Sequence, residues 1–127
     1  MIEKCYQLLV KKDIKLFDNN IYYMNKQEFV IWFQSTLKEM YEIMQRKNAD
    51  YTTTEDPFSN FRIVEKLGIS GVEQWILVRM TDKISRISNL ITREAKVKDE
   101  SITDTLQDLA NYSIILKLYI ESTRKQK

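Results

Sequence analysis

Histidine is absent from the 127-residue chain, and cysteine, glycine and proline are scarce. Without histidine there is no histidine general base, no Ser-His-Asp triad and no histidine-ligated zinc site. The single cysteine, Cys5, forms no intrachain disulfide, and beside Leu8 and Leu9 we expect a small buried apolar residue in a reducing compartment. The only glycines, Gly68 and Gly71, cannot build a Walker loop or a dinucleotide-binding turn. Any bound phosphate must therefore be held through a metal or through basic side chains.

A large excess of one charge and a long apolar run are missing as well. The chain has 20 basic and 18 acidic side chains, a net charge of +2. We therefore expect no extended nucleic-acid surface, although a small phosphorylated ligand remains compatible with this balance. No apolar run approaches the roughly twenty residues of a membrane span, and the start of the chain lacks a secretory pattern. The sequence predicts a cytoplasmic protein with no membrane partner.

The pattern of apolar residues predicts an all-α protein. We expect a single domain over 1–127, with a core at about 25–120 and an N-terminal extension at 1–24. Three polar residues are followed by an acidic residue three positions later, which is typical of helix starts: Asn25 with Glu28, Ser70 with Glu73, and Ser101 with Asp104. Gly68 suits the left-handed end of a short helix. The expected helices are a short one within 1–24, then about 25–48, about 58–67, 70–93 and 101–124.

The first long helix carries two glutamates, Glu39 and Glu42, on its flank. Arg46 lies one turn after Glu42, so the pair is either an ordinary solvated charge ladder or a set of ligands. The polar, threonine-rich segment 47–57 follows. It is either a surface connection or a loop that places binding side chains beside a cavity.

The next long helix carries a polar face with Asp82, Arg86 and Asn89 at spacings of four and three. Opposite lies an apolar stripe of Ile76, Met80, Ile84, Ile87 and Ile91. A face opposite such a stripe is normally wet. Trp75 and Val78 share the polar side, however, which favours a cover over it. The sequence leaves both interpretations open.

The last helix carries Asp104, Asp108 and Asn111 on a face that continues as Ile115 and Leu118. A face that changes from acidic to aliphatic along one helix indicates an interior position at both ends. Buried carboxylates are costly unless a cation neutralises them. A metal would do so, and so would salt bridges to Arg79, Lys83 or Arg86.

Four ordered motifs resemble a known family: Lys47-x-x-Asp50-Tyr51, Asn60-Phe61, Arg79-Met80-x-Asp82-Lys83-x-x-Arg86, and Glu100-Ser101-Ile102-x-Asp104-Thr105-Leu106-x-Asp108-Leu109-Ala110-Asn111-Tyr112. Over about 25–120 the chain resembles the nucleotide modification associated domain, type one, found largely in bacteriophages. That family is similar in architecture to the MazG-like and dimeric-dUTPase-like all-α nucleotide pyrophosphatases. The resemblance implies a bundle of four to five helices, completed by oligomerisation, with acidic side chains around a magnesium-bound nucleotide. Glu39 and Glu42 fit the E-x-x-E pair of the pyrophosphatases, whereas their second pair, E-x-x-D, is absent.

The resemblance leads to a specific functional hypothesis. The chain is expected to be a magnesium- or manganese-dependent nucleoside triphosphate pyrophosphohydrolase of phage nucleotide metabolism, forming a homodimer or larger assembly in the host cytoplasm. The expected metal-binding and catalytic residues are Glu39, Glu42, Asp82, Asp104 and Asp108. The expected ligand-binding residues are Lys47, Asp50, Tyr51, Asn60, Phe61, Lys83, Arg86, Asn111 and Tyr112. The alternatives are a non-catalytic nucleotide binder, either a regulatory module or a sponge for a host signalling nucleotide, and a structural adaptor with internal salt bridges.

Overall fold

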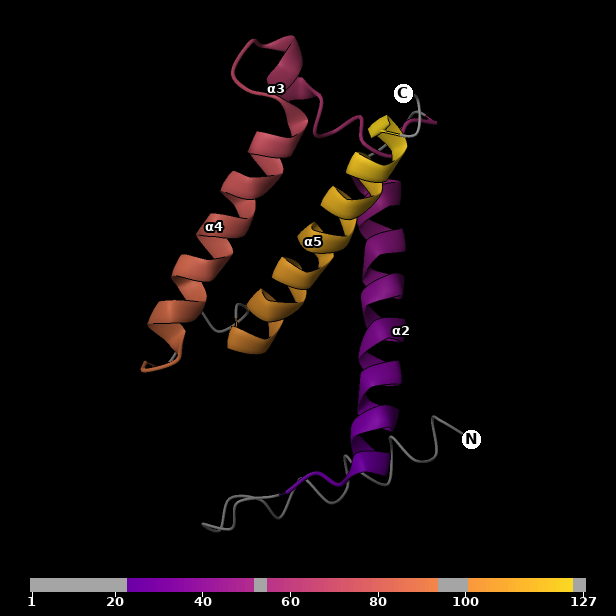
Figure 1. The fold of residues 1–127 in the computed structure, drawn as a ribbon, viewed down its shortest axis with the longest axis vertical. Helices are drawn as coiled ribbons and strands as arrows, with labels where there is room; N and C mark the ends of the chain where they lie inside the picture. Colours follow the sequence, from indigo (N-terminus) through magenta and orange to yellow (C-terminus); the bar gives the residue numbers. More distant parts are fainter. Residues whose placement is uncertain (1–22, 52–54, 94–100, 125–127) are drawn as a thin grey trace. The chain divides into compact units, whose positions relative to one another are not determined.

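The computed structural model of the chain describes residues 23–51, 55–93 and 101–124, and its regular elements there are all helices (Figure 1). The elements are α2 (Lys26–Tyr51), α3 (Ile63–Lys66), α4 (Val72–Leu90) and α5 (Ile102–Arg124). The all-α prediction is therefore confirmed. The short helix expected within 1–24 falls outside the described residues.

The chain divides into two units, Met1–Gln45 and Arg46–Lys127, and α2 crosses the boundary between them. The first unit contributes most of α2, including Glu39 and Glu42. The second contains the last turns of α2 together with α3, α4 and α5. That the whole chain is one domain stays a prediction. No helix in the described ranges is long and apolar enough to cross a bilayer.

The start of α2 is fixed by the predicted capping box. The Glu28 backbone N–H donates to Asn25 Oδ1 at 2.9 Å, and the Asn25 N–H donates to Glu28 Oε2 at 3.2 Å. Two N–H groups without a helical partner are thus satisfied reciprocally. The helix continues to Tyr51, three residues beyond the expected end, because no glycine or proline interrupts it before Pro57. Lys47 consequently lies on a helix instead of a loop.

The helix expected to begin near residue 58 is shorter in the structure. The Phe58 backbone N–H donates to Asp56 Oδ1 at 3.0 Å, and the Phe61 N–H donates to the Phe58 carbonyl at 2.9 Å. The segment stays in turns because its backbone bonds, from Ser59 to Asp56 and from Phe61 to Phe58, span three residues instead of the four of an α-helix. α3 therefore begins only at Ile63. Gly68 has φ +69°, as expected for the left-handed residue that follows a short helix.

The two ends of α4 differ from the sequence expectation. The residue preceding the helix is Gly71, and no side chain caps it, so the capping box expected from Ser70 and Glu73 is wrong. The Ser70 hydroxyl instead donates to the Gly71 carbonyl at 3.1 Å. The helix ends at Leu90, slightly before the expected end near residue 93.

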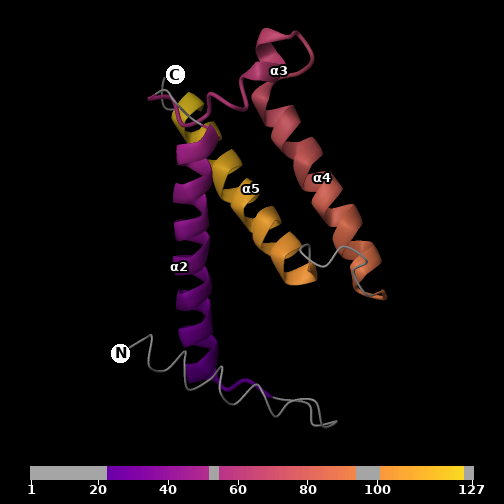
Figure 2. The same cartoon turned by 180° about the vertical axis from the view of Figure 1, so that it is seen from behind.

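α4 and α5 run antiparallel and lie side by side (Figures 1 and 2). Their shared core is centred on Val72, Ile76 and Tyr119, which are all buried. The turn segment before α3 also reaches this core. Phe58 packs edge-on against Tyr119 with ring centroids 5.3 Å apart, and the Arg62 guanidinium lies 5.6 Å from the centre of the same ring. The further residues packed against this core are Phe61, Met80, Tyr112, Ile115 and Leu116.

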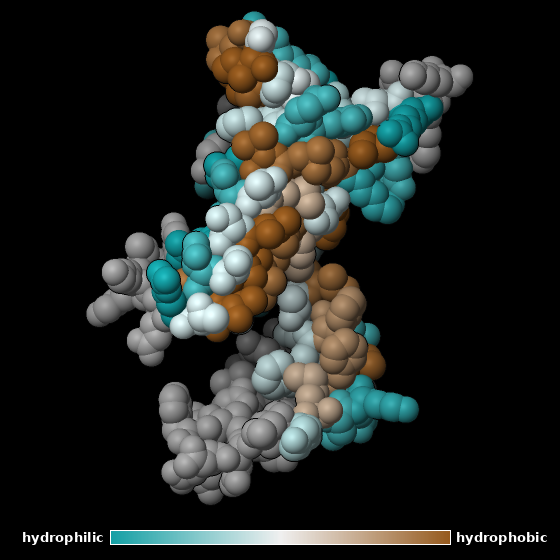
Figure 3. All heavy atoms as spheres, turned by 60° about the vertical axis from the view of Figure 1, so that its left-hand side comes forward, coloured by the Kyte–Doolittle hydropathy of each residue, from teal (hydrophilic) through white to brown (hydrophobic). Residues whose placement is uncertain are grey.

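α5 covers only one edge of the isoleucine stripe on α4. Ile76 is fully buried, whereas Ile84 is 54% and Ile91 69% exposed. Leu77, which lies beside the stripe, is 51% exposed. Apolar side chains accordingly remain at the surface of the helix pair (Figure 3). The stripe is therefore buried at Ile76 and largely exposed at Ile84 and Ile91. Because α5 packs off-centre, the basic residues along the neighbouring edge of α4 face it.

Candidate functional site

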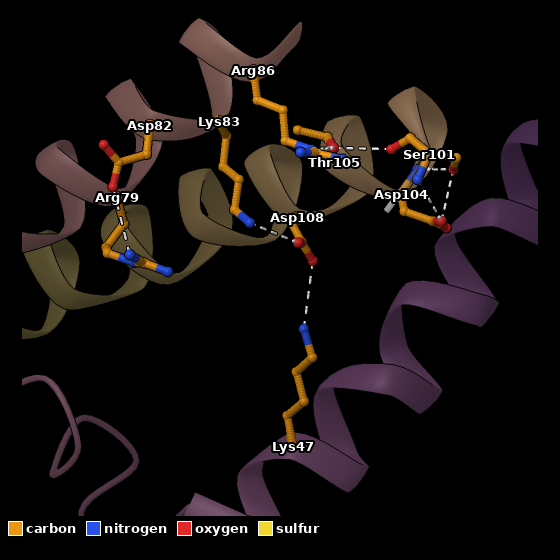
Figure 4. Close-up of polar contacts among 9 residues, drawn as sticks. All are labelled: Lys47, Arg79, Asp82, Lys83, Arg86, Ser101, Asp104, Thr105 and Asp108. Atoms are coloured by element: carbon orange, nitrogen blue, oxygen red, sulfur yellow. Dashed lines mark hydrogen bonds and ion pairs between the residues drawn. The ribbon is translucent and has the colours of Figure 1, made fainter. Parts of the chain in front are cut away.

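The Asp108 carboxylate on α5 is where basic side chains from two other segments meet (Figure 4). Lys83 on α4 lies 3.1 Å from Asp108 Oδ2, and Lys47 near the end of α2 lies 3.4 Å from Asp108 Oδ1. Lys83 is the more sheltered lysine, with 22% of its side chain exposed against 55% for Lys47. Asp108 itself is about one-third exposed. Each carboxylate oxygen thus has its own cation.

Lys83 reaches Asp108 because of its place on α4. Arg79, Lys83 and Arg86 recur at spacings of four and three, which puts them on one line of the helix beside Val72 and Ile76. α5 packs on that side, so all three basic residues are partly buried. The off-centre packing of the two helices thereby aligns a row of cations with the polar side chains of α5.

Arg86 is held by a hydroxyl that the sequence analysis did not identify. Arg86 Nε donates to Thr105 Oγ1 at 3.2 Å, and the same hydroxyl donates to the Ser101 carbonyl at 2.9 Å. Thr105 is only 3% exposed. A buried hydroxyl needs hydrogen-bond partners. The Thr105 hydroxyl finds one in Arg86 and so holds the Arg86 guanidinium against α5, the helix that carries Asp108. The only signal in the sequence is that Thr105 lies inside the fourth motif, which does not reveal its partner.

Arg79 forms the other end of the row of cations. The hydrogen bond of its guanidinium with Tyr112 and the charge of Tyr112, and after them the charges of Asp82 and Asp108, raise the pKa of Arg79. Arg79 Nη1 also lies 3.5 Å from Asp82 Oδ2 (Figure 4). Tyr112 packs against the core as well. These contacts hold the Arg79 guanidinium next to α5.

We call Lys47, Arg79, Lys83 and Arg86 the cation row. Lys47 and Lys83 pair with Asp108, Arg79 pairs with Asp82, and Arg86 is held by Thr105. The pair Lys83–Asp108 is one of the salt bridges expected as the alternative to a metal, whereas Arg79–Asp82 is a pair within α4 that was not expected.

The two aspartates outside the centre of the row have local partners. Asp82 is 61% exposed and pairs within its own helix with Arg79. Asp104 Oδ2 accepts hydrogen bonds from the Ser101 hydroxyl at 2.6 Å and from the Ser101 N–H at 3.3 Å, while the Asp104 N–H donates to Ser101 Oγ at 3.1 Å. This is the capping box predicted for the last helix, and it is confirmed. Asp104 is exposed at the start of α5 and does not turn toward Lys83 (Figure 4).

The three predicted aspartate ligands of the unit Arg46–Lys127 do not gather at one point in the described ranges. No group of three histidine, cysteine, aspartate or glutamate side chains in these ranges is placed to hold a metal ion. Glu39 and Glu42 are exposed on α2 in the unit Met1–Gln45, whereas the three aspartates belong to the unit Arg46–Lys127. The aspartates of the second unit therefore do not form a complete magnesium site by themselves. Binding of a metal by the full set of five carboxylates stays a prediction.

The other predicted ligand-binding residues lie in varied surroundings. Asp50 on the last turn of α2 and Asn60 before α3 are exposed. Phe61 packs against the core between α4 and α5, so its side chain contributes to the fold. Asn111 is partly buried on α5, one turn from Asp108. The side chain of Tyr51 falls outside the described part of the chain.

The face of α4 opposite the isoleucine stripe is solvated in one part and covered by protein in another, which are the two interpretations that the sequence left open. Asp82 and Asn89 are exposed, so the solvated interpretation applies to them. Arg86 is partly buried against α5, so the covered interpretation applies there. On α5, Asp108 and Ile115 turn toward α4 as expected of an interior face, but Leu118 is 49% exposed.

No curated protein and no solved structure matches the chain. The model of the family described as nucleotide modification associated domain 1 matches residues 47–119, more than half of the 127-residue chain. The match begins at Lys47 and ends at Tyr119, so it contains the whole cation row, Asp108 and the core beneath them. The chain belongs to the nucleotide modification associated domain 1 family.

Proposed function

We propose that this domain binds a nucleotide and holds its phosphate groups at the cation row. The observation that carries the proposal is the convergence of Lys47 and Lys83, from two different helices, on the Asp108 carboxylate. Ammonium groups that converge on one anion within a partly exposed site are also placed to receive phosphate oxygens. All of these residues lie in the family-matched segment 47–119. With neither glycine placed to build a phosphate-binding loop, this chain must hold phosphate through a metal or through basic side chains, and the cation row supplies the basic side chains.

The roles within the row differ with exposure. Lys83 is the most sheltered of the paired lysines, so a phosphate oxygen that replaces its carboxylate partner would lie in the less solvated part of the site. Lys47 is more exposed and has greater freedom to follow the ligand. Arg79 and Arg86 are tied to Tyr112 and Thr105, so they supply fixed positive charge along the row. Asn111 lies on α5 one turn after Asp108 and would offer an amide for the sugar or the base.

Calorimetric titration with a panel of ribo- and deoxynucleotides tests this proposal, using a matched pair of lysine variants. Lys83→Met removes the sheltered cation, whereas Lys117→Met removes an exposed lysine of α5 that pairs with Glu121 outside the row. A hydrogen bond to a charged group contributes about 1.5–3 kcal/mol, so Lys83→Met should weaken binding roughly ten- to a hundredfold. Lys117→Met should bind as the wild type does. Equal affinity in all three proteins would contradict the proposal, and so would a wild type that binds no nucleotide.

Hydrolysis is a second candidate activity, suggested by the resemblance of the sequence motifs to those of the MazG-like and dimeric-dUTPase-like pyrophosphatases. In that form the chain would cleave a nucleoside triphosphate to the monophosphate and pyrophosphate with magnesium or manganese. Magnesium is commonly held by one or two carboxylates together with substrate phosphates, and Glu39 with Glu42 matches one half of the pyrophosphatase signature. The aspartates of Arg46–Lys127 do not assemble a metal site on their own, so we assign no catalytic step.

Binding without turnover is therefore the function that the geometry supports best. Both oxygens of Asp108 already have lysine partners, which suits an anion-binding site more closely than a vacant metal site. The distinguishing assay incubates the purified protein with each nucleotide and magnesium or manganese, and measures pyrophosphate. Binding with no pyrophosphate release would support a non-catalytic binder, whereas release that depends on the metal would establish the enzyme.

A further inference from the structure

Asp108 occupies the position in which a ligand phosphate would meet both lysines. Lys83 approaches one carboxylate oxygen at 3.1 Å and Lys47 approaches the other at 3.4 Å (Figure 4). A carboxylate and a phosphate group are both oxygen anions that accept hydrogen bonds from ammonium groups. While Asp108 holds the two lysines, it presents to them the same kind of partner that the ligand would bring.

The contacts of Asp108 are suited to exchange. Lys47 is more than half exposed, Asp108 is about one-third exposed, and the longer of the two contacts is the one to Lys47. Ion pairs with this much solvent access are weak, so a ligand anion can displace the carboxylate from a lysine at small cost. The contacts still hold the two ammonium groups close together before the ligand arrives, which limits the side-chain entropy lost on binding.

We infer that Asp108 is an internal competitor for the ligand phosphates and that this competition makes the site select polyphosphate chains over single phosphate groups. The inference deepens the proposed function and rests on it. A single phosphate that takes one lysine remains beside the Asp108 charge, which repels it and keeps the other lysine. A chain of two or more phosphates can take both lysines and extend toward Arg79 or Arg86, so its gain exceeds the loss of the two carboxylate contacts. The favoured ligands are nucleoside diphosphates and triphosphates.

The test replaces the competitor with a neutral residue of the same shape. Inorganic phosphate, pyrophosphate and triphosphate are titrated calorimetrically into the full-length wild type and into Asp108→Asn, first with a chelator and then with magnesium. Breaking two exposed ion pairs costs a ligand about tenfold in affinity. Asp108→Asn, which lacks these pairs, should therefore bind pyrophosphate about tenfold more tightly than the wild type. The preference of Asp108→Asn for pyrophosphate over phosphate should be smaller than that of the wild type. Glu121→Gln, which makes the same charge change farther along α5 beside Lys117, should bind as the wild type does.

The opposite outcomes are equally definite. Weaker or unchanged pyrophosphate binding by Asp108→Asn would overturn the inference, and weakening seen only with magnesium would identify Asp108 as a metal ligand instead. If Asp108→Asn fails to fold, Asp108→Ser removes the same charge and must show the same gain. If the wild type binds nucleotides but neither Asp108 variant binds pyrophosphate more tightly than the wild type, the inference fails and the proposed function stands. If the variants bind pyrophosphate more tightly but no protein binds a nucleotide, the proposed function fails and the phosphate site stands.

Discussion

Replacing Ile76 with valine removes one methyl group from the centre of the contact between α4 and α5. Ile76 is 0% exposed and packs in one cluster with Val72 and Tyr119. Ile→Val at buried positions costs about 0.5–1.5 kcal/mol, and the full burial of this side chain places the expected loss near 1 kcal/mol. Ile84 belongs to the same apolar stripe but is 54% exposed, so the identical substitution there should cost less than about 0.5 kcal/mol.

Urea unfolding of both variants at several protein concentrations measures this difference. The slope of the unfolding free energy against urea should be the same in both, so that the midpoints report stability alone. An equal loss for Ile84→Val that is independent of protein concentration would refute the conclusion that α5 leaves Ile84 uncovered. A loss for Ile84→Val that grows with protein concentration would instead identify a second copy of the chain as the cover, in line with the sequence prediction of a homo-oligomer.

Three further predictions concern the elements around the site. The pKa of Asp56 is lowered from its ordinary value of 3.8, first by the hydrogen bond from Arg62. The charged Asp56 therefore stabilises the folded state above pH 3.8, and this contribution is lost as the pH falls through the lowered pKa. Urea unfolding from pH 6 to pH 2 should show the loss of stability, and the loss should be smaller in Asp56→Asn. Ser101→Ala should cost about 1 kcal/mol in thermal unfolding, because the hydroxyl caps the Asp104 N–H, and Ser101→Thr should restore most of it; an unchanged melting temperature for Ser101→Ala would contradict this. Gly68→Ala should cost about 1 kcal/mol by chemical denaturation, and Gly68→Asn less, because the φ of +69° is the sole obstacle and no atom lies within 4 Å of an added Cβ; a stabilised alanine variant would be inconsistent with that backbone.

Local signals in the sequence were sufficient for much of the fold. The capping boxes at Asn25 and Ser101 and the left-handed Gly68 depend on residues within a few positions of one another, and all three occur in the structure. The predicted cap at Ser70 failed although it has the same pattern, because Gly71 takes the position before the helix and the Ser70 hydroxyl turns to the Gly71 carbonyl. A pattern of residue types does not show which of two neighbouring residues precedes the first turn.

The packing of α4 against α5 needed tertiary information. The isoleucine stripe identifies an apolar surface, but it does not say whether a partner helix covers its centre or one edge. In the structure the edge nearest Arg79, Lys83 and Arg86 is covered, which leaves Ile84 and Ile91 exposed. The same off-centre packing is what creates the polar site between the helices.

The candidate site was predicted in part. Asp108, Lys83 and Arg86 were expected to share a polar site, and the structure brings Lys83 to Asp108 and Arg86 to Thr105. The contact between Lys47 and Asp108 joins residues 61 positions apart, so no local pattern reveals it. Thr105 was missed because a threonine inside a helix most often bonds only to its own backbone. The additional bond to Arg86 depends on the neighbouring helix.

The central claim is that nucleotide phosphates bind at the cation row, and an experimental structure of the chain with a non-hydrolysable deoxynucleoside triphosphate analogue tests it most directly. We predict phosphate oxygens within hydrogen-bonding distance of both the Lys83 and Lys47 ammonium groups, with the Asp108 carboxylate displaced from at least one of them. Phosphates bound at another surface, with both lysines still paired to Asp108, would contradict the account.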